Sequence, residues 1–271
     1  MPMPPGAEAY QAHEPPVVAC GVRYTPEEVG AVLDTSVGAL ARDGAGAQQL
    51  ADFLTGVADT EFKSDALRRA FDSRPQLEDW RVGEMIAEAY LADHRRCVFP
   101  WPTARDLRDS NASLPGTDLV GFQQTDEPAG LYRLVFAEVK TSNDSTIPPS
   151  VMYGRHGLKL QLEELRDSQS TRDTLFLYLA WRAITGVPWG DKYRRAAARY
   201  LADSADVAIF GVLVRDVTPD RRDLRGRARS LARGCPTSMH VELIAIYLPP
   251  DTIKGLGARV AGFVEGDHAN N

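Results

Sequence analysis

The sequence predicts an α/β protein in which a mixed β-sheet is flanked by helices and follows a helical N-terminal region. Three observations support this fold class. Apolar side chains recur at helical intervals over roughly the first hundred residues, short apolar runs typical of strands follow, and helical and strand-like segments then alternate. A chain of 271 residues can form one large domain, or a compact domain with an extension.

Composition and charge are those of an ordinary folded protein, with 44% apolar and 25% charged residues. The net charge of −6 gives the chain no overall basic footprint for nucleic acid, so such binding would need a local patch or a partner. The cysteines, at positions 20, 97 and 235, lack the CxxC spacing of zinc sites and favour a reducing, cytoplasmic location. No apolar run approaches the length of a membrane span, so no membrane association is expected.

The N-terminal part is predicted to be a flexible leader followed by helices. Residues 1–20 open with MPMPPGAEAYQAHEPP, which is rich in proline and is not a signal peptide. Residues 21–76 are expected to form a helical region, whose first helix has Thr25 as its cap and Pro26 in its first turn. Its helical segments are TPEEVGAVLDTSVGALARD, GAQQLADFLTGVADTEF and SDALRRAFDS.

Residues 77–271 are expected to form the main domain, which begins with a long helix over residues 77–94. One apolar stripe of this helix comprises Trp80, Met85, Ala89 and Ala92, and a second comprises Val82, Ile86 and Tyr90. Two prolines then predict a loop near residues 98–113. Four strands are predicted in DLVGF, LYRLVFAEV, ADVAIFGVLV and MHVELIAIYL. The later helices are predicted over residues 156–186, divided near Ser170, in DKYRRAAARYLADS, and in DTIKGLGARVAGFVEG.

Charged residues lie at the ends of the first two predicted strands. Asp118 precedes one strand, and Glu138 and Lys140 close the next. Residues two apart on a strand point to the same side, so Glu138 and Lys140 project together while Val139 faces the core. If the two strands pair as an antiparallel hairpin, Asp118 lies near Glu138, and two carboxylates and one ammonium share a small volume.

Carboxylates this close repel each other, and one pKa rises unless a divalent cation neutralises both. Mg²⁺ prefers such hard oxygen ligands. A neighbouring lysine can orient a metal-bound water, help to deprotonate it, or stabilise charge on a phosphate. The chemistry predicted from these residues is metal-assisted hydrolysis of a phosphodiester.

These residues resemble the signature of the PD-(D/E)XK nuclease superfamily over roughly residues 78–165. Asp118, Glu138 and Lys140 match its three defining positions, although Gly116 and Thr117 stand where a proline often precedes the aspartate. The resemblance implies the mixed sheet and flanking helices of that superfamily.

The superfamily usually adds an acidic residue on the helix before the hairpin. Glu84 in RVGEMIAEAYL fits this position, with Glu88 one turn further on as the alternative. Related nucleases often carry a glutamine near the scissile phosphate, and Gln161 matches it, although a plain surface role is equally compatible with its helix. Lys159 is interpreted as a solvated charge or a phosphate contact, and His156 as a general base or a hydrogen-bonding spectator.

Within the superfamily, the R-x-G-E helix, G-T-D-L-V-G-F and the A-E-V-K strand are similar to the HamA family, the nuclease subunits of Hachiman anti-phage defence. The resemblance implies Mg²⁺, with Mn²⁺ able to substitute, held by Glu84, Asp118, Glu138 and the backbone carbonyl of Val139. It implies that Lys140 positions the attacking water. DNA would be the substrate, and a HamB-like helicase subunit would restrain and deliver the nuclease in a heteromeric complex.

Two other functions stay open: a restriction or repair nuclease that acts alone, and a non-catalytic regulatory or scaffold subunit of a DNA-processing complex. A basic patch beside the site would favour the first, and a large exposed apolar patch would favour a subunit. The basic run RRDLRGRARSLARG, residues 221–234, carries six arginines against one acid. It is interpreted either as a track for DNA phosphates or as a solvated loop or helix.

Overall fold

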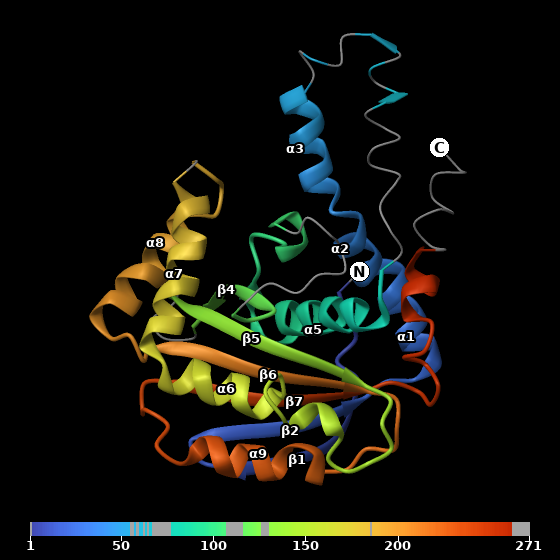
Figure 1. The fold of residues 1–271 in the computed structure, drawn as a ribbon, viewed down its shortest axis with the longest axis vertical. Coiled ribbons are helices and arrows are strands. Elements are labelled where there is room, and N and C mark those ends of the chain that lie inside the picture. Colours follow the sequence, from blue (N-terminus) through green and yellow to red (C-terminus); the bar gives the residue numbers. More distant parts are fainter. Residues whose placement is uncertain are drawn as a thin grey trace.

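A seven-stranded mixed sheet runs through the centre of the molecule, and helices cover both of its faces (Figure 1). The computed structural model describes residues 2–54, 77–106, 116–125, 130–184 and 186–261, with isolated positions between 57 and 66. The strand order is β1-β2-β7-β6-β5-β4-β3. The strands are β1 (Ala7–Glu14), β2 (Val17–Arg23), β3 (Cys97–Val98), β4 (Leu119–Gln124), β5 (Tyr132–Ser142), β6 (Val207–Arg215) and β7 (His240–Tyr247). The predicted α/β class is confirmed.

The central strands β2, β7, β6 and β5 pair in parallel, and β1, β4 and β3 pair antiparallel at the two edges. Every residue of β6 is buried, which explains its unbroken apolar sequence, because a parallel strand in mid-sheet is covered on both faces. The predicted hairpin is present as β4 and β5.

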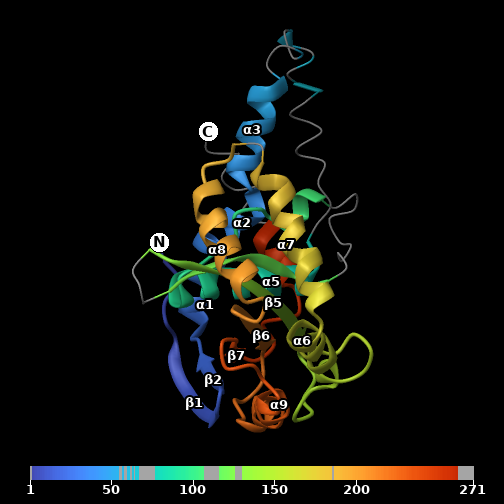
Figure 2. The same cartoon turned by 90° about the vertical axis from the view of Figure 1, so that its left-hand side faces the viewer.

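Helices from different parts of the chain form the two outer layers (Figures 1 and 2). One face carries α1 (Pro26–Val32), η1 (Leu33–Val37), α2 (Gly38–Arg42), α5 (Asp79–Arg95) and a short helix at residues 256–261. The other face carries α6 (Leu158–Asp167), α7 (Gln169–Ala183), α8 (Gly190–Ala202) and α9 (Arg222–Ala232). The short 3-10 helices are η2 (Thr103–Asp106) and η3 (Ser150–Met152). Each face has its own apolar core.

Several helix ends follow the sequence signals. Thr25 caps α1 in a capping box with Glu28, as the cap prediction required. Ser168 separates α6 from α7, close to the predicted division near Ser170. α3 (Gly44–Leu54) has no buried residue and projects away from the sheet (Figure 2). The predicted helix over residues 64–73 lies largely outside the described residues, and none of the described helices has the length and apolar character needed to cross a membrane.

The expectation that residues 1–20 form a leader outside the fold is wrong. β1 and most of β2 lie within this range, and β2 pairs with β7 in the register Val18↔Glu242. On β1, the hydroxyl of Tyr10 lies 3.3 Å from that of Tyr247. The proline-rich stretch therefore forms one edge of the sheet. The prolines at positions 15 and 16 lie in the turn between β1 and β2, so they do not interrupt either strand.

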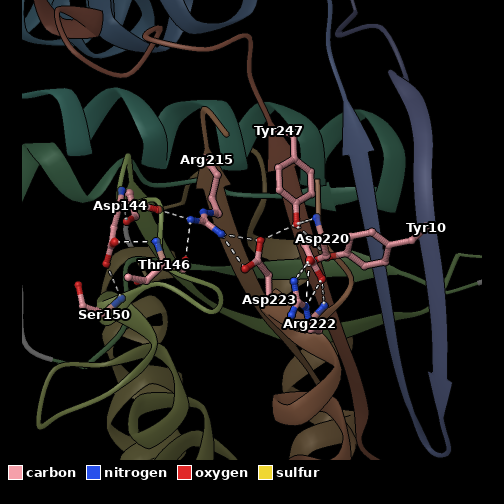
Figure 3. A network of polar contacts seen from close by, with 10 residues as sticks. Tyr10, Asp144, Thr146, Ser150, Arg215, Asp220, Arg222, Asp223 and Tyr247 are labelled. Carbon is pink, nitrogen blue, oxygen red and sulfur yellow. Dashed lines mark hydrogen bonds and ion pairs between the residues drawn. The ribbon is translucent and has the colours of Figure 1, made fainter. Parts of the chain in front are cut away.

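A buried ionic network ties the end of β6 to α9 and to the chain after β5 (Figure 3). Arg215 and Asp223 are completely buried, and Arg215 Nη1 donates to both oxygens of Asp223, at 2.6 and 2.7 Å. Tyr247 donates to Asp223 Oδ2 at 2.7 Å. Arg215 Nη2 donates to the carbonyl oxygens of Asp144 and, at 3.0 Å, Thr146. Arg215 thus holds the segment that leaves β5.

We expect Asp223→Ala to lower the free energy of unfolding by about 3–5 kcal/mol, because it leaves a buried guanidinium without its counter-charge. Urea denaturation measures this effect. Glu14→Gln is the control, because Glu14 also pairs with an arginine, Arg229, at 3.0 Å, but on the surface. It should change stability little. Equal effects of the two substitutions would contradict the role assigned to the network.

Candidate functional site

The register of β4 against β5 brings Asp118 opposite Glu138. Leu119 pairs with Ala137, so the residue before β4 faces the residue after Ala137. β4 begins only at Leu119, so its pairing with β5 does not extend beyond this point. Residues 139–142 of β5 pair with β6 alone among the described strands. β5 therefore has an open edge at this point, and the charged residues lie around it.

Short hydrogen bonds hold the two carboxyl groups in place. Asp118 Oδ2 accepts the backbone N–H of Val139 at 2.7 Å, and Lys140 Nζ donates to Glu138 Oε1 at 2.7 Å. Thr117 donates to a backbone carbonyl of β5 at 2.7 Å, which fastens the start of β4. The carboxyl groups of Asp118 and Glu138 lie within hydrogen-bond reach of each other. The structure thus brings together the three residues of the predicted motif.

Glu84 reaches the same cavity from α5, which packs closely against β5. With Asp118 and Lys140 it lines a cavity of ≈ 190 Å³, whose remaining lining residues are Trp80, Val139 and Thr141. The Glu84 side chain is only 9% exposed and accepts a hydrogen bond from Arg81 Nη1 at 2.5 Å. Arg81, buried beside it, was not anticipated from the sequence, although its i, i+3 spacing from Glu84 allows such a pair.

Glu88, the alternative to Glu84, belongs to a different cavity. That cavity of ≈ 410 Å³ is also lined by Pro2, Ser36, Leu40, Ala89, Ala92 and Asp93. Burial, and after it the charge of Glu84, raises the pKa of Glu88 to about 8. Glu84 is therefore the helix carboxylate that joins Asp118 and Lys140.

The close approach of α5 to β5 depends on Gly83. A Cβ atom at this position would lie 1.9 Å from Thr141 Oγ1, a separation that no side chain can adopt. The absence of a side chain lets the helix contact the strand, and the next residue, Glu84, then faces the cavity. In the R-x-G-E stretch, the glycine sets the position of the glutamate.

Desolvation is the main electrostatic feature of the site. Burial, and after it repulsion from Asp118, raises the pKa of Glu84 to about 7 and that of Glu138 to about 8. Burial also raises the pKa of Asp118, although Lys140 and the Val139 N–H oppose this effect. One oxygen of Glu138, Oε2, is buried without any hydrogen-bond donor. A proton or a cation is needed to relieve this arrangement.

The oxygen atoms around the cavity suit a hard divalent cation. Glu84, Asp118 and Glu138 supply carboxylates. In an extended strand the N–H and C=O of a residue point the same way, so the carbonyl of Val139 also faces the open edge. Within the described residues no three His, Cys, Asp or Glu side chains already have the arrangement of a metal site. Lys140 instead neutralises Glu138, so binding a cation requires these ion pairs to rearrange.

Residues predicted on the second face are not joined to this cluster by any described contact. Gln161 lies on α6, and its amide oxygen is buried without a partner. Lys159 forms a partly exposed ion pair with Glu163 at 3.7 Å. His156 is exposed in the turn before α6. The structure leaves Gln161 as a candidate by position alone.

The basic run at residues 221–234 forms α9 and the turn after it. Three of its six arginines form ion pairs: Arg225 and Arg229 share Glu14, and Arg222 pairs with Asp220. A solvated helix and a track for DNA phosphates are both compatible with these contacts, and no arginine of this run lines the carboxylate cavity.

Comparison with known proteins gives no assignment. No protein-family model matches the chain, and no curated protein matches it significantly. The functional argument therefore rests on the residues of this site and their geometry.

We expect Gly83→Ala to destabilise the protein by about 1–3 kcal/mol and to displace Glu84, because the added methyl group overlaps Thr141. Thermal and urea denaturation measure the loss, and Thr141→Ala in the same chain should recover part of it. Gly226→Ala on α9 is the matched control, since its Cβ would meet no atom within 4 Å. That control should stabilise the helix by about 0.5–1 kcal/mol.

The raised carboxyl pKa values predict that the metal-free protein loses stability as pH rises from about 5 to 8. In this window the folded state retains protons that the unfolded chain releases near its ordinary pKa of 4.5, so deprotonation disfavours folding. A tenfold difference in acidity between the folded and the unfolded state corresponds to about 1.4 kcal/mol of folding free energy.

Unfolding measured at several pH values should therefore show a shallower slope in Glu138→Gln than in the unmodified protein. Mg²⁺ at pH 8 should restore stability to the unmodified protein and much less to the variant. A Glu138→Gln slope equal to that of the unmodified protein would rule out the assigned titration.

Proposed function

We propose that the chain is a metal-dependent deoxyribonuclease that hydrolyses phosphodiester bonds. The observation that carries this proposal is the convergence of Asp118, Glu138 and Lys140 at the open edge of β5, with Glu84 lining the same cavity from α5. The buried, donor-free Glu138 Oε2 supports it, because natural proteins seldom leave a carboxylate oxygen in this state without a functional reason.

Glu84, Asp118, Glu138 and the Val139 carbonyl would hold Mg²⁺, with Mn²⁺ able to substitute. When bound, the cation supplies a water of lowered pKa and polarises the phosphate. The protein orients its own groups: the Val139 N–H fixes Asp118, and Arg81 fixes Glu84. Lys140 carries the positive charge that positions the attacking water or offsets charge developing on the phosphate.

A role as the effector subunit of an anti-phage complex, restrained and delivered by a HamB-like helicase, is the finer part of the proposal. Exposed apolar side chains support a partner-binding surface on α7, where Leu177, Trp181 and Ile184 are 49%, 69% and 72% exposed. On α3, Phe53 is 82% exposed. No arginine of α9 lines the carboxylate cavity, so the basic run does not lie beside the site, and these features favour a subunit over a nuclease that acts alone.

The deciding experiment incubates plasmid and linear DNA with the protein in Mg²⁺ or EDTA, with and without the protein encoded next door. The Glu138→Ala, Lys140→Ala double variant should remain folded, because it removes a buried carboxylate together with the ammonium paired with it and leaves neither partner alone. Its cleavage rate should fall by at least about a hundredfold, since a metal ligand and the ammonium are both lost.

Asp191→Asn, at an exposed position on α8, is the control and should cleave normally. The same double variant is tested in a phage challenge and in a pull-down with the partner, whose binding should persist. Protection that survives the double substitution would falsify the nuclease proposal and favour the scaffold function.

A further inference from the structure

Trp80 lines the carboxylate cavity and has no place in either apolar core. It lies in the first turn of α5, one turn before Glu84, and both side chains border the ≈ 190 Å³ cavity. The sequence predicted Trp80 to be part of a buried stripe of this helix. The indole is instead half-buried and packs with neither group of core residues.

The other tryptophans show how distinct this position is. Trp101 and Trp189 pack against the core of the second face, and Trp101 also donates to Asp106 at 3.1 Å. Trp181 is exposed on α7 and lines neither described cavity. Trp80 is therefore the tryptophan at the candidate site, and its ring contributes to the packing of neither apolar core.

Arg81 holds the Trp80 ring in position. Its guanidinium carbon lies 5.1 Å from the ring centroid, within the range of a cation–π contact. The same guanidinium donates to Glu84 at 2.5 Å, which fixes it relative to the cavity. Trp80, Arg81 and Glu84 thus form one connected unit on the first turns of α5, with the ring oriented before any ligand arrives.

We infer that Trp80 forms a nucleobase subsite beside the carboxylates and that the strand to be cut enters with an unpaired base stacked on this ring. The inference rests on the proposed function and names its substrate as single-stranded DNA or a frayed end. Aromatic rings bind bases of any sequence by stacking, whereas bases inside a duplex are already stacked on one another. Trp80 and the carboxylates border the same cavity of ≈ 190 Å³, so a base stacked on the ring brings its nucleotide beside the carboxylates.

The test compares Trp80→Leu and Trp80→Phe with the unmodified protein. Binding of fluorescent oligo-dT is measured by anisotropy in EDTA, where no cleavage occurs, and cleavage of single-stranded and blunt duplex oligonucleotides is measured in Mg²⁺. Trp80→Leu should weaken oligo-dT binding about 5- to 150-fold, the range expected for one lost stacking contact, while Trp80→Phe retains most of the affinity. Tyr153→Leu, at an exposed aromatic side chain that lines neither described cavity, is the matched control and should bind normally.

The outcomes separate the inference from the proposed function. If the unmodified protein cleaves DNA and Trp80→Leu binds and cleaves single strands equally well, the subsite is wrong and the nuclease stands. If nothing cleaves but oligo-dT binding depends on Trp80, the subsite stands and the nuclease is wrong. Faster cleavage of blunt duplex than of single strands by the unmodified protein would also overturn the inference. Thermal denaturation confirms that each variant is folded.

Discussion

The carboxyl groups of Glu84, Asp118 and Glu138 share one small desolvated volume, and their mutual repulsion constrains everything packed around them. Burying a charge costs several kcal/mol unless partners compensate for it. Lys140 and Arg81 supply positive charge, and a backbone N–H stabilises Asp118. This compensation is incomplete, as the raised pKa of Glu138 and its donor-free oxygen show. A site that opposes folding in this way is expected where a ligand completes it.

The surrounding structure prevents the cluster from relaxing. β5 is paired with β6 through Ser142, beyond the point where β4 ends, so the strand cannot bend away freely at Lys140. In the segment after β5, the carbonyl oxygens of Asp144 and Thr146 accept hydrogen bonds from Arg215. The close contact between Gly83 and Thr141 fixes α5 against β5. Repulsion among the carboxylates is therefore met by changes in protonation or ion binding rather than by movement of the backbone.

The sequence predicted the parts of this arrangement that depend on local pattern. The alternation in β5 and the short connection to β4 are enough to place Asp118 near Glu138, and the fold class follows from the order of elements. The N-terminal strands could not be predicted, because β2 is defined by pairing with β7, near the other end of the chain. Helical periodicity places Trp80 in an apolar stripe of α5, but it cannot show which elements that stripe contacts, so the position of Trp80 at the cavity could not be predicted. The contact between Gly83 and Thr141 likewise exists only in three dimensions.

The acidity of the site also constrains how nucleic acid could be held there. Without a cation, the phosphate of a strand would meet three carboxyl groups and only two nearby basic side chains, both already engaged in ion pairs. Three of the six arginines at residues 221–234 are engaged with acidic partners, and none of the six lines the cavity. Cation and phosphate should therefore bind with positive coupling, each improving the affinity for the other by the same factor. Stacking on Trp80 adds affinity without adding charge, and the exposed apolar side chains of α7 offer a surface through which a partner could provide the rest. Under the proposed function, the ion pairs of Lys140 and Arg81 would keep the site inactive until strand and cation bind together.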